Sequence, residues 1–504
     1  MAIRLDQYNN QLFVTDTVTA NAPLVLQPSG TGALQAQLTD STATGGNARG
    51  ANAVDWQTSR GIAAAVASGT QSALVGGYSN LVSGTYSFIG GGVSNGALGA
   101  QAVVVGGNQN NAGNQWTFIG GGFANSAQGI YNFIGAGSTN SGTASAAVTT
   151  QTGTMNGTTA VTLSGSNANI KVGQVVLGTS INSYQTYVAA ISGTSLTLSL
   201  AATGSSTSTL SFYTPHGVVV GGGNNQATGS YSFIGGGGDA GTAANRNVAS
   251  GDWSFVGGGT KNTASGNHSS VSGGYGAVAS GVASFVGGGG LYGDFSLGAF
   301  APNTASSIAS SVIGGWNNTA SANGAGVLAS VESLASGFYS AVVGGSYGTT
   351  RGIVGNIVFP ANNNPISTRG NAQSALLVLG VQTTDATATV LRSNSSAAST
   401  INQVILPNNS AYFFTGEVVS GVTGGGNTKG WKIEGVIKRG ANAASTALVG
   451  TPTVTSTYAD AGASTWVIAV TADTTNGGLA VTFTGQASTT IRTVCRLNTT
   501  EMTF

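Results

Sequence analysis

The sequence has little charge, a single cysteine and no long apolar run. Only 6% of its 504 residues are Asp, Glu, Lys or Arg, and the formal net charge is +1. No charged residue occurs between Arg60 and Lys171. A nucleic-acid-binding surface needs clustered basic side chains, so we predict no nucleic-acid partner. A membrane-spanning helix needs about eighteen or more apolar residues in a row, so we predict no membrane insertion.

The cysteine content and the N-terminus bear on the cellular compartment. One cysteine, Cys495, excludes a framework of internal disulfides. It stands in the alternating stretch Ile491-Arg-Thr-Val-Cys-Arg-Leu, where we expect a buried strand residue and not a reactive thiol. The opening residues, Met1-Ala-Ile-Arg-Leu-Asp-Gln-Tyr, lack the apolar segment of a secretory signal. We therefore expect the protein to fold in the cytoplasm in which it is made.

Glycine is abundant, with 82 residues, and it recurs with a fixed period. The stretch Ser72-Ala-Leu-Val-Gly-Gly-Tyr-Ser-Asn-Leu-Val-Ser-Gly84 returns fifteen residues later as Ser87-Phe-Ile-Gly-Gly-Gly-Val-Ser-Asn-Gly-Ala-Leu-Gly99. The short apolar run predicts a strand, and the Gly pair predicts a tight corner. Two short strands and two corners in fifteen residues describe one coil of a narrow β-solenoid.

An asparagine keeps the same phase in successive repeats. In a coil of fixed period these side chains would stack into a ladder, in which identical amides reinforce one another. This ladder is a structural prediction, and its members are Asn80, Asn95, Asn110, Asn125 and Asn140.

The repeat predicts about thirteen coils, in two blocks. At ~4.8 Å per rung they make a rod on the order of 60 Å long. About seven residues are inserted before Trp253 and about twelve around Tyr292 to Ser307. The predicted rungs begin near residues 72, 87, 102, 117, 132, 217, 232, 254, 269, 284, 311, 326 and 341.

Such a coil is thin, because its second inward position holds small residues such as Val82 and Ala97. Little apolar area is buried per rung, so neighbouring chains are expected to cover it. The pattern S-F-I-G-G-G-x-x-N-x-A-x-G resembles the left-handed β-roll in the heads of trimeric autotransporter adhesins and in bacteriophage fibre and spike proteins. The resemblance covers roughly residues 62 to 355. It implies a left-handed roll and a homotrimer.

Charge and an aromatic residue cluster just before the repeats. Gly-Asn-Ala-Arg-Gly followed by Ala-Val-Asp-Trp-Gln-Thr is similar to a segment that precedes such rolls in phage structural proteins. We predict that the trimer begins here, with ion pairs between chains. Exposed charges that contribute little are the alternative. The candidate residues are Arg49, Asp55, Trp56 and Arg60.

The period is broken by residues 145–214, whose alternating runs predict a small all-β domain. It is a candidate for binding a glycan or a neighbouring protein, and a spacer role is equally open. Three aromatic residues at or beside insertions are predicted to lie on loops that leave the coil and are candidates for surface recognition: Trp253, Tyr292 and Trp316. Such residues also pack loops onto a rod, which is the alternative.

Residues 357–504 lose the repeat and show longer alternating strands, such as Gly430-Trp-Lys-Ile-Glu-Gly-Val-Ile-Lys. Regular strand and turn spacing predicts an antiparallel β-sandwich. It resembles the terminal knob of phage fibres. Pro360 and Pro365 are predicted to mark a linker before it.

The sequence offers no clear catalytic group. Glycoside hydrolysis needs two neighbouring carboxylates, and of those in the repeats only Asp239 and Asp252 bracket one insertion and are expected to approach each other. The two histidines, His216 and His268, lack metal-ligand spacing. We predict no enzymatic activity, no cofactor and no metal. The remaining carboxylates of the repeats, Asp294 and Glu332, are isolated.

Together these features predict an all-β, trimeric left-handed β-roll with an inserted β domain and a C-terminal sandwich knob. We predict a virion protein, a phage tail fibre that attaches to a host-surface glycan or protein and joins other virion proteins through its N-terminal segment. A capsid-decorating head fibre or cement protein is the alternative, and a bacterial surface adhesin is the third. The predicted parts are residues 1–61 (attachment or cap), 62–144 (shaft), 145–214 (insert), 215–356 (shaft) and 357–504 (knob).

Overall fold

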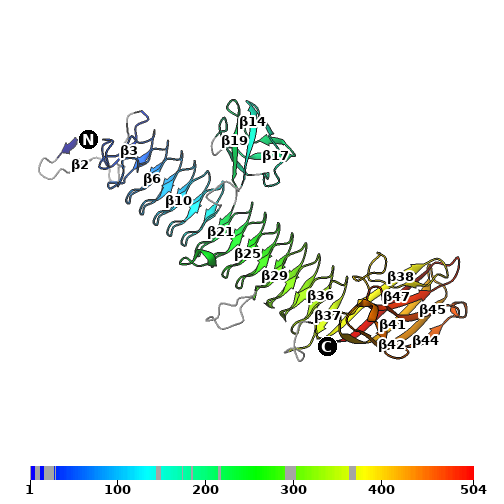
Figure 1. The fold of residues 1–504 in the computed structure, drawn as a ribbon. Helices are drawn as coiled ribbons and strands as arrows, with labels where there is room; N and C mark the ends of the chain where they lie inside the picture. The colour runs from blue at the N-terminus through cyan, green and yellow to red at the C-terminus, as the bar shows by residue number, and fades with distance from the viewer. Residues whose placement is uncertain are drawn as a thin grey trace.

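The chain forms a long rod that carries a small domain on one side and a larger one at its C-terminal end (Figure 1). The computed structural model describes residues 2–5, 12–15, 28, 30–142, 149–172, 174–182, 186–213, 217–289, 302–362 and 370–504. Within this part of the chain no helix is long and apolar enough to cross a membrane. The predicted all-β class is confirmed, because the helical content described is three short 3-10 turns, η1 (Ala243–Asn245), η2 (Ala443–Ser445) and η3 (Ala461–Ala463).

The rod is a parallel β-solenoid, as predicted. Each coil adds one short strand to a continuous parallel ladder, the first ladder. Its strands are β3 (Leu34–Gln35), β4 (Val54–Asp55), β5 (Ala73–Leu74), β7 (Phe88–Ile89), β9 (Val103–Val104), β11 (Phe118–Ile119), β13 (Phe133–Ile134), β20 (Val218–Val219), β22 (Phe233–Ile234), β24 (Phe255–Val256), β26 (Ser270–Val271), β28 (Phe285–Val286), β30 (Ser311–Val312), β33 (Gly326–Leu328), β36 (Ala341–Val343) and β37 (Ile357–Pro360).

A second ladder runs along another side of the rod, and Ser141 bridges its two halves by pairing with Ser126 and Gln226. A third side is held by single bridges and by β31 (Gly315–Trp316) paired with β34 (Ser330–Val331). The strands of the second ladder are β6 (Leu81–Val82), β8 (Gly96–Ala97), β10 (Asn111–Ala112), β12 (Ser126–Ala127), β21 (Gln226–Ala227), β23 (Val248–Ala249), β25 (Thr263–Ala264), β27 (Val278–Ala279), β29 (Thr304–Ala305), β32 (Thr319–Ala320) and β35 (Leu334–Ala335).

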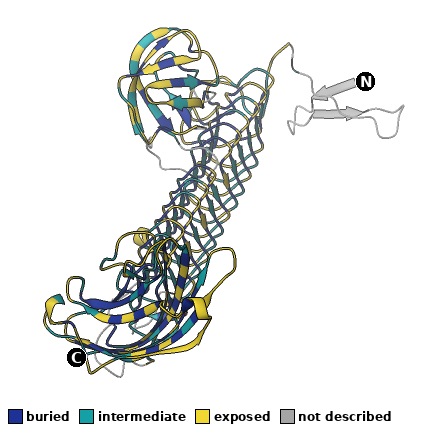
Figure 2. Cartoon of the chain, turned by 90° about the vertical axis from the view of Figure 1, so that its right-hand side faces the viewer, coloured by how far each residue is buried: buried dark blue, intermediate teal, exposed yellow. Residues whose placement is uncertain are grey.

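The core of the rod is a narrow column of apolar side chains, one from each strand. Successive strand residues point to opposite faces, so Phe88 points outward while Ile89 is fully buried. The second ladder contributes mostly alanine to this column, as at Ala97. Figure 2 shows buried and exposed residues alternating along the shaft. One glycine is obligatory in most coils: Gly92 has φ +88°, and a Cβ there would overlap the carbonyl oxygen of Gly107 in the next coil.

The solenoid is longer than the sequence pattern indicates. All thirteen predicted rungs have a strand in the first ladder, but β3, β4 and β37 extend it at both ends. The count of about thirteen coils is therefore too low, and the roll begins well before residue 62. Pro360 ends β37, which pairs on both sides, so it does not mark a linker. Pro365 lies outside the described residues.

The inserted segment folds as one antiparallel sheet with the order β16-β19-β14-β15-β18-β17. Its own apolar core includes Leu210 and Phe212. The chain leaves the solenoid after Gly142 and returns at Gly217, and Figure 2 shows the domain standing beside the rod. The strands are β14 (Thr149–Asn156), β15 (Ala160–Leu163), β16 (Val175–Leu177), β17 (Val188–Ser192), β18 (Ser195–Leu198) and β19 (Ser205–Tyr213).

The terminal domain continues the first ladder without a break. β37 is parallel to β36 on one side and antiparallel to β38 on the other. Two antiparallel sheets then enclose one apolar core that contains Trp431, Trp466 and Phe483. One sheet contains β38 (Ala372–Thr383), β41 (Ser410–Val422), β42 (Thr428–Arg439), β43 (Ala447–Leu448), β44 (Thr453–Ala459) and β47 (Ile491–Thr503), and the other β39 (Thr389–Val390), β40 (Val404–Ile405), β45 (Val467–Asp473) and β46 (Gly478–Thr484). At the opposite end of the chain, β1 (Ala2–Leu5) and β2 (Leu12–Thr15) form an antiparallel pair.

Candidate functional sites

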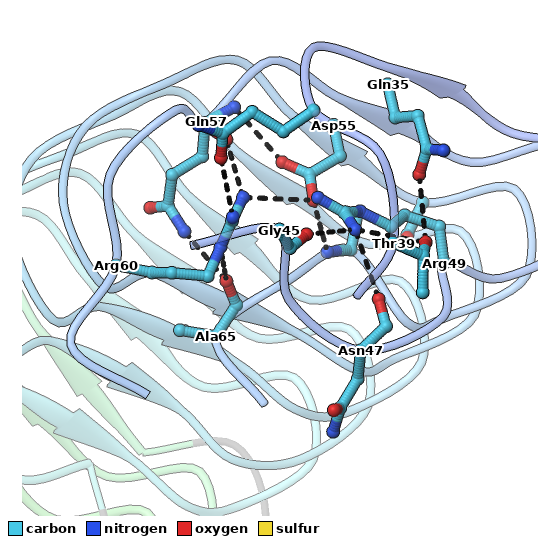
Figure 3. Close-up of polar contacts among 12 residues, drawn as sticks. Gln35, Thr39, Gly45, Asn47, Arg49, Asp55, Gln57, Arg60 and Ala65 are labelled. Carbon is cyan, nitrogen blue, oxygen red and sulfur yellow. Dashed lines mark hydrogen bonds and ion pairs between the residues drawn. The ribbon is translucent and has the colours of Figure 1, made fainter. Parts of the chain in front are cut away.

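A buried ion cluster closes the N-terminal end of the solenoid (Figure 3). Asp55 lies on β4 in register with Leu74, so a carboxylate occupies an inward position that is apolar in later coils. Arg49 Nε lies 2.8 Å from Asp55 Oδ2, and an Arg60 guanidinium nitrogen lies 4.0 Å from the same oxygen. All three side chains are almost completely buried. Pairing of this kind is what allows charges to remain inside a protein.

Arg60 is held by backbone as well as by charge. Its guanidinium donates to the carbonyl oxygens of Ala65, Thr44 and Gln57, the last at 2.6 Å. Burial lowers the pKa of Arg60, and the charge of Asp55 opposes this shift. These ion pairs form within one chain. Pairing between chains at this point, which the sequence suggested, stays a prediction. Trp56, the fourth predicted residue, is nearly half exposed beside the cluster.

The asparagines line up as the sequence pattern predicts. Oδ1 of Asn95 accepts from the backbone N–H of Asn110 in the next coil, at 3.0 Å. Its Nδ2 donates to Gly91 O and Gly107 O. Each amide thus satisfies corner groups of two coils. The same bond from coil to coil joins Asn80 to Asn95, Asn110 to Asn125 and Asn125 to Asn140.

The asparagine ladder extends further than its predicted members. Asn140 accepts from the backbone of Asn225, so the ladder continues across the inserted domain. At the N-terminal end Gln57 takes the place of an asparagine and accepts from the backbone of Asn80 at 2.8 Å. Sequence reasoning missed Gln57 because it lies twenty-three residues before Asn80 and is out of the fifteen-residue phase.

The recognition candidates lie in different surroundings. Trp253 is not on an inserted loop, which corrects the prediction: it lies at a corner of a regular coil, two residues before β24, and stacks on Tyr231 and His268. Trp316 belongs to β31 on the third side of the rod. Tyr292 lies outside the described residues.

Trp253 belongs to a set of side chains that we call the corner column. Its members stand two residues before successive first-ladder strands and have left-handed backbone, with φ between 50° and 59°. Trp116 and Tyr131 stack with their ring centroids 4.7 Å apart. The column consists of Tyr86, Gln101, Trp116, Tyr131, Tyr231, Trp253 and His268.

The carboxylates of the shaft do not form the expected pair. Asp239 accepts from Gly241 and Asn245 in its own inserted loop, and these bonds lower its pKa. Asp252 instead lies next to the corner column and accepts from the backbone of Ser230. The expectation that they approach each other is therefore wrong. Among the described residues no group of three or more His, Cys, Asp or Glu side chains is arranged to hold a metal ion. Cys495 is buried, as expected, and burial raises its pKa to about 12.

The outward side of the first ladder is an apolar stripe of nearly constant bulk. Where a strand begins with Phe, the residue two positions later is glycine, as in Phe118 and Gly120, and the phenyl ring lies over that glycine. Where the strand begins with a small residue, the later position is large in most coils, as in Gly326 and Leu328; β26 is the exception, with Ser270 and Ser272. The Phe–Gly pairs are Phe88/Gly90, Phe118/Gly120, Phe133/Gly135, Phe233/Gly235, Phe255/Gly257 and Phe285/Gly287.

The second ladder has a different outward side. From β21 onward, the residue that follows each of its strands is Ser or Thr, for example Ser265 after β25. These hydroxyls are small and polar and suit contact with water. From β21 onward the cross-section of the rod is therefore amphipathic, with one apolar side and one hydroxyl-rich side.

No protein-family model and no curated protein sequence matches this chain. Two solved structures with similarity are both bacteriophage tailspike proteins. The tailspike of Acinetobacter baumannii phage AM24 is 8% identical with a TM-score of 0.18, over 83% of this chain and 67% of that one. The tailspike protein gp49 of Acinetobacter baumannii bacteriophage Fri1, a capsular polysaccharide depolymerase, is 7% identical with a TM-score of 0.15, over 79% of this chain and 80% of that one.

These similarities do not place the chain in a family, but they correct one prediction. The sequence led us to exclude enzymatic activity, and a depolymerase among the similar structures contradicts that exclusion. The exclusion is withdrawn. The geometry described above assigns no catalytic residue in its place.

Proposed function

We propose that the chain is the subunit of a trimeric phage tail fibre that attaches the virion to the surface of its host. In this arrangement the apolar stripe on the first ladder is the contact between chains, and the terminal domain lies at the distal end. The observation that carries the proposal is the nearly constant combined bulk of the two outward positions, which holds from β5 to β36 except at β26. Free surface has no need of constant bulk, whereas a surface packed against a neighbour does.

The dimensions of the stripe agree with this role. A strip roughly 60 Å long and about 10 Å wide offers roughly 600 Å² per chain, or about 1,800 Å² summed over three chains. In a trimer each chain divides this strip between its two neighbours. The resemblance of the repeat to trimeric roll proteins supports three chains over two.

Attachment is supported by the shape of the molecule. A long rod with a separate domain at its far end holds that domain away from the particle, and three copies raise the avidity of weak individual contacts. A virion location follows from the same proposal. The alternative, a capsid-decorating head fibre, uses the same parts at another place on the particle.

The oligomeric state tests the interface. We expect sedimentation equilibrium to give the mass of three chains and Phe255→Asp to reduce it to one, because three buried carboxylates would have no counter-charge. Ser265→Asp, which places the same charge on the hydroxyl-rich side, should leave the trimer intact. A monomeric native protein, or equal effects of both substitutions, would contradict the proposed interface.

The place and role on the virion need a second experiment. Antibody raised against the purified protein should label the tail in electron micrographs, and the labelled protein should bind host cells and compete with the phage for adsorption. Label over the capsid would favour the head-fibre alternative. Absence of both binding and competition would overturn the attachment role.

A further inference from the structure

The inserted domain leaves the rod at the corner that carries the corner column. The chain departs after Gly142, beyond the second ladder, and returns at Gly217, just before β20 of the first ladder. The domain therefore replaces one corner of a coil. From there its loops reach back along the preceding coils, which Figure 1 shows as the domain lying beside the shaft near β10.

A cleft of about 520 Å³ separates the inserted domain from these coils. Three successive corners form one wall, and they contribute Tyr86, Gln101, Gln115 and Trp116. Tyr187 and the neighbouring residues 199–200 of the insert form the other wall. The cleft has three aromatic side chains, two from the coils and one from the insert. Their exposed fractions are 58% for Tyr86, 42% for Trp116 and 47% for Tyr187.

Trp116 is fixed in a defined orientation. One face of its ring stacks on Tyr131, with an interplanar angle of 5°. The opposite face therefore turns toward the preceding coil, where the corner residue is Gln101 and not an aromatic. An aromatic face held in this way offers a flat apolar platform at little cost in conformational entropy.

The repeat is modified in the coil that carries Trp116. The position before each corner dipeptide is glycine in most coils, but here it is Asn114, whose Oδ1 accepts from the Gln115 backbone at 2.9 Å and whose Nδ2 donates to Gln128 O at 3.1 Å. Gln115 is only 5% exposed, and its Oε1 has no hydrogen-bond partner among the described residues. A buried acceptor without a donor costs about 1–3 kcal/mol. A ligand that donates a hydrogen bond would remove that cost.

The chemistry of the walls selects the ligand. The cleft is lined by aromatic rings, amides, hydroxyls and small apolar side chains, with no charged side chain among its lining residues. Phosphate and carboxylate ligands lack a cationic partner here. A neutral sugar matches each feature, because its C–H faces stack on aromatic rings and its hydroxyls donate to amide oxygens.

We propose that this cleft binds a short neutral oligosaccharide, with Trp116 and Tyr187 as stacking platforms and Gln115 Oε1 as a hydroxyl acceptor. This proposal depends on the proposed attachment function in one respect: that function makes the host surface the source of the sugar. It places recognition on the shaft, in addition to the terminal domain.

Titration calorimetry on the intact protein tests the cleft. The probes are neutral oligosaccharides of a few hexose units released from the host's surface polysaccharide, with the acidic oligosaccharides of the same digest for comparison. We expect the neutral fraction to bind, and Trp116→Ala and Tyr187→Ala each to weaken binding about tenfold or more. Tyr339→Ala is the matched control, since Tyr339 has the same place in a distant coil and does not line the cleft.

Gln115→Leu separates a ligand contact from a structural role. If Gln115 Oε1 accepts a hydrogen bond from the ligand and is unpaired without it, the leucine variant should bind sugar more weakly. The midpoint of its thermal unfolding should stay the same or rise. A lowered midpoint with unchanged binding would make Gln115 structural and overturn its assignment. Binding by the acidic fraction alone, or no binding by either fraction, would overturn the cleft itself.

The outcomes also separate this inference from the proposed function. Host cells bound equally well by the native protein and by Trp116→Ala, with no sugar bound in solution, would leave the attachment role standing and remove the cleft. If the protein binds neutral sugar in solution but binds no host cell, the cleft is supported and the attachment role is overturned.

Discussion

At the scale of single residues, Asp55 shows how the solenoid is closed at its N-terminal end. The inward column of the rod is apolar, and an open end would expose it to the column of another chain. A carboxylate with two buried arginines makes this end polar, with the charges paired within the chain. The end coil then has no apolar face to offer, as is required of the terminal unit in a repeat protein.

We expect Asp55→Asn to destabilise the protein by about 3–5 kcal/mol, because it leaves two buried guanidinium groups without a counter-charge. Urea denaturation followed by tryptophan fluorescence measures the loss. The control is Glu417→Gln, which breaks the Glu417–Arg496 pair at 3.1 Å, where the side chains are 62% and 56% exposed. That change should cost less than about 1 kcal/mol. Similar losses in the two variants would contradict the role of burial.

At the scale of the coil, two neighbouring glycines are expected to differ in how well they tolerate a side chain. Gly92 has a left-handed conformation and lies against the next coil, whereas its neighbour Gly91 has open space where a Cβ would stand. We expect Gly92→Ala to lower stability by about 2–4 kcal/mol through strain and overlap. Gly91→Ala should change it by less than about 1 kcal/mol in either direction. Thermal unfolding of the two variants measures the difference, and a costly Gly91→Ala would contradict the assigned geometry.

The coil is also the scale at which the sequence was most informative. The period of fifteen residues placed each of the thirteen predicted rungs and the asparagine ladder, because equivalent positions in successive coils have the same local environment. It missed β3 and β4, where the spacings are twenty and nineteen residues and Asp55 replaces the apolar residue on which the pattern depends. It also misread Trp253 as a loop residue, because the insertion before it ends earlier, at the opposite corner of the coil.

At the scale of the whole molecule, the sequence could not predict the cleft. Its walls come from residues about 70 to 115 positions apart, such as Trp116 and Tyr187, and they meet only because the inserted domain folds back along the rod. Gln115 carried no signal of its own, since its unpaired oxygen is a property of the packed structure. Of the aromatic residues chosen from the sequence, Trp253 and Trp316 do not line it.

The proposed contact between chains is apolar, and much of the shaft has no charged residue. The shaft between Arg60 and Lys171 has no charged residue, and the proposed contact between chains follows an apolar stripe. Salt screens ion pairs, since the Debye length falls from about 10 Å at 0.1 M to about 3 Å at 1 M, but it does not weaken apolar contacts. We therefore expect the trimer to keep its sedimentation coefficient from about 0.1 M to about 1 M NaCl. Dissociation as salt rises would show that ion pairs hold the chains together, and would move the interface from the first ladder to the charged ends of the chain.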